Sequence, residues 1–297
     1  MSNITINKGD LALGLKTWSF PAGERGVKLD TTDLKYLYGP GFWHVITARL
    51  QSPADVMDLL LVKDALDRDT RFTQRLVKTP VHLFLSYCPY GRQDRVCTEG
   101  ESFSLGVFAR LINGAGFERV TIVDPHSEVT SAVINNLTVI DQKTVVGRFD
   151  ALNRRLFGEG VRFKLVSPDA GANKKTSDLA KYFGHVDFIR ADKRRNLATG
   201  EIVETVVYAD RLDGVEAVVV DDLIDGGKTY IELAKVLKAK GAAKVILYAT
   251  HGIFSKGTKP LFEAGIDEIF STNSFYEIWP AGVDGVTTLK LEDVFTI

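Results

Sequence analysis

Acidic residues precede a glycine turn near residue 225, and this stretch carries the strongest chemical signal in the chain. It reads Asp221-Asp222-Leu223-Ile224-Asp225-Gly226-Gly227-Lys228-Thr229. Backbone N–H groups at a glycine turn that opens a helix bind anions, because they point outward at the positive end of the helix dipole. Carboxylates beside such a turn would repel a phosphate unless they bind hydroxyls of the same ligand or a divalent cation. A polyol phosphate meets both conditions.

The segments on either side predict the strand and the helix that position this turn. Residues 215–220 form a short β-branched run without polar alternation, which is typical of a buried parallel strand. After Thr229, the residues Tyr230, Leu233, Ala234 and Leu237 follow the i, i+3, i+4, i+7 spacing of one helix face. The alternative interpretation is a ligand-free strand-to-helix turn with acidic capping residues.

Strands and helices alternate along the rest of the chain. Further strands are expected over 42–50, 81–87, 119–123, 163–166, 186–190 and 244–250, and helices from Ser52-Pro53, over 102–112 and over 173–183. This order predicts an α/β fold with mostly parallel sheets. Polar loops follow the strands in both halves, so we expect two domains, 1–145 and 146–297.

Composition excludes several classes of function. The chain has 297 residues, 45% of them hydrophobic, and a net charge of −1, so it offers no global attraction for nucleic acid or an anionic membrane. No apolar run reaches the length of a membrane span, and the start lacks a signal-peptide pattern, which predicts a cytoplasmic protein. Cys88 and Cys97 are too few for a disulfide framework or a thiolate metal site.

Several polar loops, taken in order, resemble those of the ribose-phosphate diphosphokinase (PRPP synthetase) family. They are Tyr90-Gly91-Arg92-Gln93-Asp94-Arg95, Val123-Asp124-Pro125-His126, Ser167-Pro168-Asp169-Ala170-Gly171, Lys193-Arg194-Arg195, the acidic stretch at 221–229, and Thr250-His251-Gly252-Ile253-Phe254-Ser255. The resemblance runs from about Phe20 to Thr272. It implies two tandem domains that are each like a type I phosphoribosyltransferase. A phosphoribosyltransferase itself is disfavoured, because it would share only the acidic stretch.

The resemblance also implies a reaction and its site residues. The family transfers the diphosphoryl group of ATP to the C1 hydroxyl of ribose 5-phosphate, which depends mainly on positioning and on cationic stabilisation of phosphoryl oxygens. By resemblance, Lys193 and Arg195 are the catalytic pair on a mobile loop, and His126 and Asp169 hold Mg²⁺. The implied ATP-binding residues are Phe20, Glu24, Arg92, Gln93 and Asp94. The implied ribose-phosphate residues are Asp169, Asp221, Asp222, Asp225, Gly226, Gly227, Lys228 and Thr229.

Other interpretations of these residues stay open. For the Lys193 cluster the alternative interpretation is a solvated charged hairpin, and without the resemblance His126 would be interpreted as a core or capping histidine. In the family, the aromatic and acidic residues that match Phe20 and Glu24 hold adenine from a neighbouring subunit, which implies a homo-oligomer with a shared active site. His251 is expected near the ribose or a regulatory anion. A catalytically silent regulatory homologue is a further alternative.

The phosphate loop departs from the family pattern. The family usually has Asp-Thr-x-Gly-Thr where this chain has Asp225-Gly226-Gly227-Lys228-Thr229. The change removes a hydroxyl at Gly226 and adds a long cation at Lys228. A closed pocket for a terminal phosphate would be crowded by that lysine, whereas an open site for a diphosphate could use it. ADP-ribose is therefore an alternative acceptor for the same transfer.

Overall fold

The computed structural model describes residues 3–8, 11–30, 43–68, 80–195 and 202–295. The chain divides into two compact units, and each is described by itself. Unit 1 comprises Met1–Ile140 and Phe295–Ile297, and unit 2 comprises Asp141–Val294. The sequence placed the border between domains near residue 145. In the described part of the chain, no helix is both long and apolar enough to cross a membrane.

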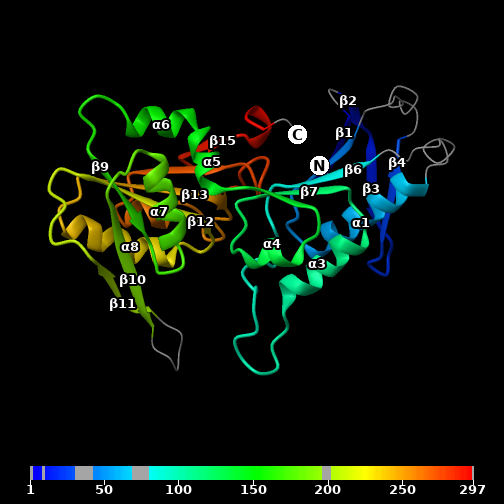
Figure 1. Cartoon of the computed structure of the whole chain (residues 1–297), viewed down its shortest axis with the longest axis horizontal. Coiled ribbons are helices and arrows are strands. Elements are labelled where there is room, and N and C mark those ends of the chain that lie inside the picture. Colours follow the sequence, from blue (N-terminus) through cyan, green and yellow to red (C-terminus); the bar gives the residue numbers. More distant parts are fainter. Residues whose placement is uncertain (1–2, 9–10, 31–42, 69–79, 196–201, 296–297) are drawn as a thin grey trace. The chain divides into compact units, whose positions relative to one another are not determined.

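Unit 1 is built on a sheet whose strand order is β2-β1-β5-β6-β7-β8. Figure 1 labels its strands β1, β2, β6 and β7. Its strands are β1 (Ile4–Lys8), β2 (Leu11–Leu13), β5 (His44–Ala48), β6 (Val81–Leu85), β7 (Arg119–Val123) and β8 (Leu137–Ile140). Strands β5 to β8 are parallel and adjacent in chain order, and β1 and then β2 extend the sheet with antiparallel pairing. The helices are α1 (Pro53–Arg68), α3 (Ser104–Gly114) and α4 (Val129–Val133).

The core of unit 1 joins its helices to the sheet. Leu59 and Val62 of α1 and Phe108 of α3 are fully buried in one cluster with Leu83 and Ile122 of the strands. Ser52 begins α1 as the sequence predicts, since its hydroxyl contacts both the backbone N–H and the carboxylate of Asp55. A separate hairpin, β3 (Leu15–Ser19) and β4 (Arg25–Leu29), packs against this core.

Unit 2 has a seven-stranded sheet in the order β11-β10-β9-β12-β13-β14-β15. Its strands are β9 (Phe163–Ser167), β10 (Phe188–Arg195), β11 (Ile202–Val207), β12 (Glu216–Ile224), β13 (Lys244–Gly252), β14 (Glu268–Thr272) and β15 (Val286–Leu289). Only the β10–β11 pair is antiparallel. The helices are α5 (Gln142–Gly147), α6 (Asp150–Leu156), α7 (Asn173–Tyr182), α8 (Lys228–Ala239) and α9 (Lys259–Glu263), with a 3-10 turn at Leu291–Asp293.

The strand order of unit 2 reverses between β9 and β12. From β9 the chain continues to β10 on one side, whereas β12 to β15 are added on the other side. In open α/β sheets, such a reversal leaves a crevice at the carboxyl ends of the strands, where ligands bind. At the opposite ends of the strands, Arg155 is hydrogen-bonded to Glu216 and Glu268, the first residues of β12 and β14. Arg155 thus ties together the amino ends of two strands, and the carboxyl ends of the strands are left for a site.

These two parallel-rich sheets flanked by helices confirm the α/β class predicted from the sequence. The strand at 119–123 has the predicted bounds. Four strands extend past their predicted ends, two of them by four residues or more: β12 continues to Ile224, and β10 continues to Arg195. Both extensions contain charged residues, which masked the strand pattern. Because each extension pairs with a neighbouring strand, pairing prevailed over local polarity.

Candidate active site

The acidic stretch lies at the carboxyl end of β12, and part of it belongs to the strand itself. Asp221 pairs with Ala249 of β13, and Leu223 pairs with His251. The sequence predicts a strand over 215–220 with Asp221 and Asp222 at its end; the strand continues two residues beyond Asp222, to Ile224, and the turn begins at Asp225. Gly227 precedes α8 with φ 78°, and an added Cβ would lie 2.9 Å from the Leu261 side chain. Glycine is needed there for its backbone conformation and for space.

Asp221 is directed toward α8. The Tyr230 hydroxyl lies 2.7 Å from Oδ2 of Asp221 and 2.7 Å from the carbonyl oxygen of Leu223, and Oδ1 of Asp221 accepts the backbone N–H of Asp222. Burial raises the pKa of Asp221 well above its ordinary value, and the neighbouring charge of Asp222 raises it further. Burial likewise raises the pKa of Tyr230. Sequence reasoning identified Tyr230 only as part of a helix face and missed this contact.

Asp222 points the other way, because successive side chains on a strand alternate between its faces. Its carboxylate lies 3.7 Å from Nζ of Lys175 on α7. Asp169 follows β9, the strand on the other side of the reversal, and its Oδ1 accepts the backbone N–H of Ala172. The charge of Asp169 also contributes to the raised pKa of Asp221. Unit 2 therefore has carboxylates on both sides of the strand-order reversal, Asp169 after β9 and the acidic stretch at the end of β12.

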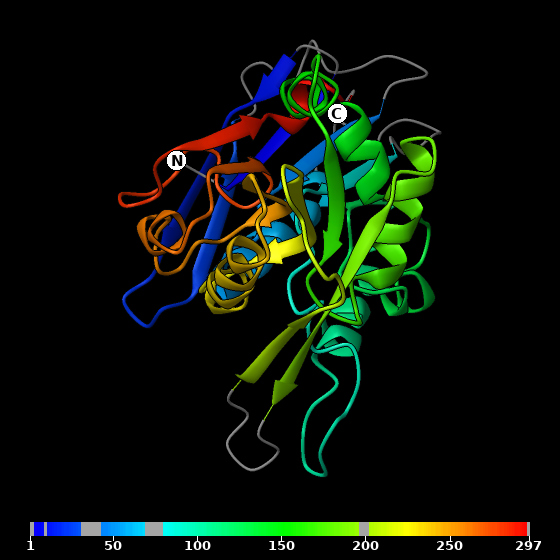
Figure 2. The same ribbon diagram turned by 90° about the vertical axis from the view of Figure 1, so that its left-hand side faces the viewer.

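Lys193 and Arg195 lie on β10, in the hairpin that projects from the sheet (Figure 2). Lys193 pairs with Thr205 and Arg195 with Ile202 of β11, with a bulge between Arg194 and Arg195. We expected Lys193 and Arg195 to lie in a loop, but the backbone of both residues belongs to strand β10. The rest of the predicted flap, residues 196–200, lies outside the described residues.

In unit 1, two loops meet where β6 and β7 end. Arg92, Gln93 and Asp94 lie in the loop after β6, and His126 follows β7. A Cβ added to Gly91 would lie 3.5 Å from Cβ of His126, so the two loops touch. Asp94 is buried, and its carboxylate accepts bonds from Nε and Nη2 of Arg95 at 2.8 and 3.0 Å. This pairing lowers the pKa of Asp94 to about 2, with a smaller contribution from the charge of His126.

The backbone of these loops is strained at two residues. Tyr90 has φ 62° and Asp124 has φ 37°, values that are uncommon for residues with a side chain. Such strain gathers at functional sites, where the surrounding structure enforces it. The carbonyl oxygen of Gln93 also accepts the N–H of Leu105, which fixes the first loop to α3.

Phe20 and Glu24 flank the turn of the β3–β4 hairpin. The N–H of Phe20 donates to the carbonyl oxygen of Glu24 at 2.8 Å, and Gly23 has φ 90° within the turn. The Phe20 side chain is 47% exposed, and its ring meets Trp18 edge-on at 6.0 Å. An exposed aromatic ring beside a carboxylate can stack on a base and accept a hydrogen bond from it.

A buried ion pair anchors this hairpin to α1, and sequence reasoning missed it. Arg25 donates to Asp58 through Nε at 2.8 Å and through Nη2 at 2.5 Å, while Nη1 donates to Ser19. The Asp58 side chain is only 6% exposed. The one hint of this pair in the sequence was Asp58, an acidic residue next to the apolar stripe of the predicted helix. Bidentate Arg–carboxylate pairs fix geometry as well as distance, so this pair sets the direction of the hairpin.

Two other places bear on the sequence predictions. His251 is buried, and its Nδ1 lies 2.8 Å from Oγ of Ser274, which is a structural contact; its expected proximity to ribose or an anion stays a prediction.

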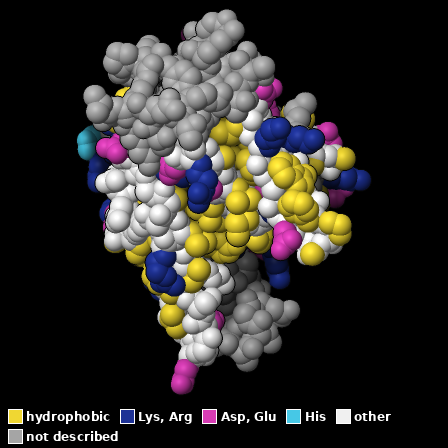
Figure 3. Space-filling model, turned by 90° about the vertical axis from the view of Figure 1, so that its right-hand side faces the viewer, with side chains coloured by type: hydrophobic (Ala, Val, Ile, Leu, Met, Phe, Trp, Pro, Cys, Tyr) yellow, Lys and Arg dark blue, Asp and Glu magenta, His cyan; other side chains and the backbone are white. Residues whose placement is uncertain are grey.

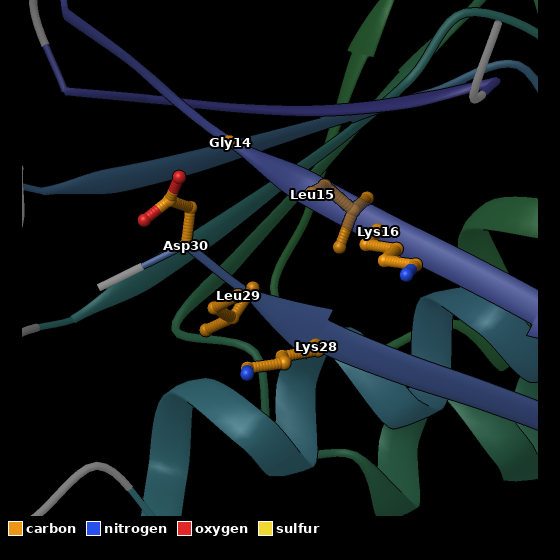
Figure 4. Close-up of a pocket in the computed structure, with 6 residues that line it drawn as sticks. All are labelled: Gly14, Leu15, Lys16, Lys28, Leu29 and Asp30. Atoms are coloured by element: carbon orange, nitrogen blue, oxygen red, sulfur yellow. The ribbon is translucent and has the colours of Figure 1, made fainter. Parts of the chain in front are cut away.

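An open pocket of about 460 Å³ lies at the base of the β3–β4 hairpin (Figure 4) and is lined by Gly14, Leu15, Lys16, Lys28, Leu29 and Asp30. No residue predicted to act in the site lines this pocket.

Metal-binding side chains are sparse. Within the described ranges there is no group of three or more His, Cys, Asp or Glu residues that could hold a metal ion. Mg²⁺ in phosphoryl-transfer sites is usually held by one or two carboxylates together with water and substrate phosphates. The mutual repulsion of Asp169, Asp221 and Asp222 is the feature of this chain that a divalent cation would relieve.

Several curated proteins of similar sequence are named ribose-phosphate pyrophosphokinase. The family model of the phosphoribosyl synthetase-associated domain matches residues 203–294. A ribose-phosphate pyrophosphokinase of Mycoplasmopsis pulmonis is 33% identical over 78% of this chain and 70% of its own length. The enzymes of the same name from Aquifex aeolicus and Thermococcus kodakarensis are 32% and 29% identical, over 78% and 90% of this chain and 71% and 88% of their own lengths.

The fold has a solved counterpart. The crystal structure of phosphoribosylpyrophosphate synthetase from Mycobacterium smegmatis matches with a TM-score of 0.77, covering 95% of this chain and 88% of that one at 22% identity. At this identity the match shows the fold. The sequence matches show the family, and they confirm the resemblance seen in the loops. The chain is a member of the ribose-phosphate pyrophosphokinase (PRPP synthetase) family of transferases.

Proposed function

We propose that this chain transfers the β,γ-diphosphoryl group of ATP to the C1 hydroxyl of a ribose 5-phosphate unit. The C1 oxygen attacks the β-phosphorus, the bond to the α,β-bridging oxygen breaks, AMP leaves, and the hydroxyl proton passes to solvent. The observation that carries the proposal is the cluster of Asp169, Asp221 and Asp222 beside a glycine turn at the strand-order reversal of unit 2. That arrangement suits a ligand with both hydroxyls and a phosphate.

The acceptor would bind to unit 2. The backbone N–H groups of Gly226, Gly227 and the first turn of α8 would hold the 5-phosphate. Asp222 would accept hydrogen bonds from the ribose hydroxyls, and Asp225 and Thr229 would complete the loop. Asp221 would position the loop indirectly, through its hydrogen bonds to the Tyr230 hydroxyl and to the backbone N–H of Asp222. The pairing of Asp222 with Lys175 at 3.7 Å is loose enough for a hydroxyl to replace it.

ATP would bind to unit 1. Phe20 would stack on adenine and Glu24 would accept from its amino group, while Arg92 and Gln93 would hold the phosphates. Asp94 would keep this loop in place through its bonds to Arg95. Lys193 and Arg195 would stabilise the charge that builds on the transferred group. By family resemblance, His126 in unit 1 and Asp169 in unit 2 are each proposed as Mg²⁺ ligands, and Mg²⁺ would neutralise phosphate charge when it is bound.

We further propose a homo-oligomer in which the β3–β4 hairpin serves a neighbouring copy. The exposed ring of Phe20 supports this, and so do exposed apolar residues on the helices of unit 1, namely Met57, Val107 and Leu111. Figure 3 shows apolar side chains gathered on one face. Exposed apolar patches of this kind mark sites of protein association.

The acceptor has two candidates. Ribose 5-phosphate is the first, because the related enzymes are named for it. ADP-ribose is the second, and the names of the relatives give it no support. The observation that favours it is the open phosphate loop: Lys228 is exposed, and a Cβ added to Gly226 would meet nothing closer than 3.7 Å. A substituent beyond the 5-phosphate would therefore find space and a cation.

The test is AMP release from ATP and Mg²⁺ with each acceptor in turn. The proposal predicts AMP formation that depends on an acceptor and falls by at least about 100-fold in Lys193→Ala and Arg195→Ala, the size expected when a charge-stabilising group is removed. Unchanged turnover in both variants would contradict the assigned roles. The ratio of kcat/KM for the two acceptors decides between them.

A further inference from the structure

A lysine outside the acidic stretch lies against the phosphate loop. The position that a Cβ of Gly226 would take is 3.7 Å from Cγ and 4.0 Å from Cε of Lys256, and 3.7 Å from Oγ of Ser255. The aliphatic part of Lys256 therefore passes over the turn that we assign to phosphate binding. Lysine side chains often lay this apolar stem on a surface and leave the ammonium group in water.

The segment that carries Lys256 is held firmly at the end of β12. The N–H of Ile253 donates to the carbonyl oxygen of Ile224 at 2.8 Å, and the N–H of Gly257 donates to that of Phe254 at 2.7 Å. Phe254 has φ 47°, is 2% exposed and packs on Trp279. A strained, buried residue two positions before Lys256 shows that the surrounding structure fixes this turn.

The charges around the loop leave two cations available. Lys228 and Lys256 are both exposed, and neither forms an ion pair with another residue that the structure describes. Both stand beside outward-facing N–H groups at the start of α8, where the helix dipole is positive. Asp221 turns toward Tyr230 and Asp222 faces Lys175, which leaves Asp225, in the turn itself, as one negative charge beside the two lysines. An anion is the partner that fits.

We propose that Lys256 is an acceptor-binding residue whose ammonium group contacts the phosphoryl oxygens on O5 of the ribose. Ser255 supplies a hydroxyl next to the position where Gly226 has none. The inference rests on the proposed function and deepens it, because it places a recognition element for the 5-phosphoryl group on a segment separate from the 221–229 stretch. The ligand class is a ribose with one or more phosphoryl groups on its 5-position.

The test compares three variants in steady-state kinetics. Lys256→Met keeps the aliphatic stem and removes the charge, so the KM for the acceptor should rise about 10- to 100-fold, the range for a lost charged hydrogen bond, while kcat and the KM for ATP stay within a factor of two. Lys256→Arg should restore most of the affinity. Lys259→Met is the matched control, since Lys259 is exposed on α9 and pairs with Glu263.

A binding measurement separates this inference from the proposed function. Calorimetric titration with ribose 5-phosphate and with ADP-ribose, without ATP, should show weaker binding to Lys256→Met than to wild type and Lys259→Met, with the difference shrinking at high salt. Equal affinities in the two lysine variants would overturn the inference, even if the wild type releases AMP. Weakened binding in a protein that never releases AMP would uphold the inference and overturn the proposed function.

Discussion

The two units are both parallel-rich α/β sheets, yet their strand orders differ. In unit 1 the parallel strands β5 to β8 follow chain order, and its candidate residues lie on loops after the adjacent strands β6 and β7 and on an added hairpin. In unit 2 the order reverses between β9 and β12, and carboxylates from both strands gather at that reversal. Strand order therefore decides whether the candidate residues of an α/β sheet lie at a crevice between diverging strands or on loops that follow successive strands.

The same residue type also has opposite electrostatic settings in the two units. Asp221 in unit 2 is buried beside other carboxylates, so its pKa is raised. Asp94 in unit 1 is buried against the guanidinium of Arg95, so its pKa is lowered to about 2. The proposed function assigns the acceptor to the carboxylate crevice of unit 2 and ATP to the loops and the hairpin of unit 1. Each assignment can be tested separately.

The largest expected effect is that of Asp222→Asn in unit 2. Losing the charged acceptor for the ribose hydroxyls should lower kcat/KM for the acceptor by about 100-fold and leave the KM for ATP unchanged. Asp187→Asn is the control, because Asp187 is an exposed residue of the same unit that pairs with Lys164. An equal loss for ATP and acceptor would break the division of roles between the units.

Weakening the anchor of the hairpin in unit 1 should give the complementary result. In Asp58→Asn the bidentate pairing with Arg25 is lost, the hairpin tip becomes less fixed, and the KM for ATP should rise about tenfold with acceptor KM unchanged. Asp64→Asn on the same helix removes only an exposed pair with Arg68 and serves as control. If both variants behave alike, the Arg25–Asp58 pair does not position the hairpin for the nucleotide.

A smaller effect concerns the pH dependence of stability in unit 2. Because the pKa of Asp221 in the folded protein lies above its unfolded value of about 3.8, its contribution to stability is fully present below pH 3.8 and is lost as the pH rises through the folded pKa. Asp221→Asn removes this loss, so its free energy of unfolding should gain on that of wild type between pH 4 and pH 7. Urea denaturation at several pH values measures this, and a constant difference would refute the raised pKa.

The smallest effect is the opposite dependence in unit 1. The pKa of Asp94 is lowered to about 2, so its contribution to stability is present above pH 3.8 and is lost as the pH falls toward 2. Arg95 is exposed, so solvent screening keeps the contribution small. Asp94→Asn should therefore fall below wild type in stability at pH 5 and approach it near pH 2. A difference that does not change with pH would show that Asp94 is not paired in solution.

The sequence predicted the elements whose bounds depend on local residue patterns. The strand at 119–123 and the start of α1 came from β-branched runs and from the capping signal of Ser52. The order of loops identified the family, and the charge of Asp169 acts on Asp221 of the acidic stretch; the binding roles of these carboxylates stay a prediction. The hydrophobic pattern did not predict strands that are fixed by pairing with a neighbouring strand. Strand β11 and the charged end of β10 form a hairpin through contacts that no local periodicity reveals.

Contacts distant in sequence account for the other omissions. Arg25 and Asp58 are 33 positions apart, and Lys256 reaches Gly226 from the next strand's loop. The Tyr230 hydroxyl is invisible to a hydrophobic pattern, which counts the residue as apolar. Such pairs follow from the placement of whole elements, so they could be read only after the sheet was known.

The identity of the products is the most direct test of the central claim. Phosphorus-31 NMR of a reaction with ATP, Mg²⁺ and ribose 5-phosphate or ADP-ribose should show AMP and, in equal amount, a new diphosphate attached to C1 of the acceptor. Release of ADP with a single phosphate on the acceptor, or no acceptor-dependent AMP with either sugar, would contradict the account.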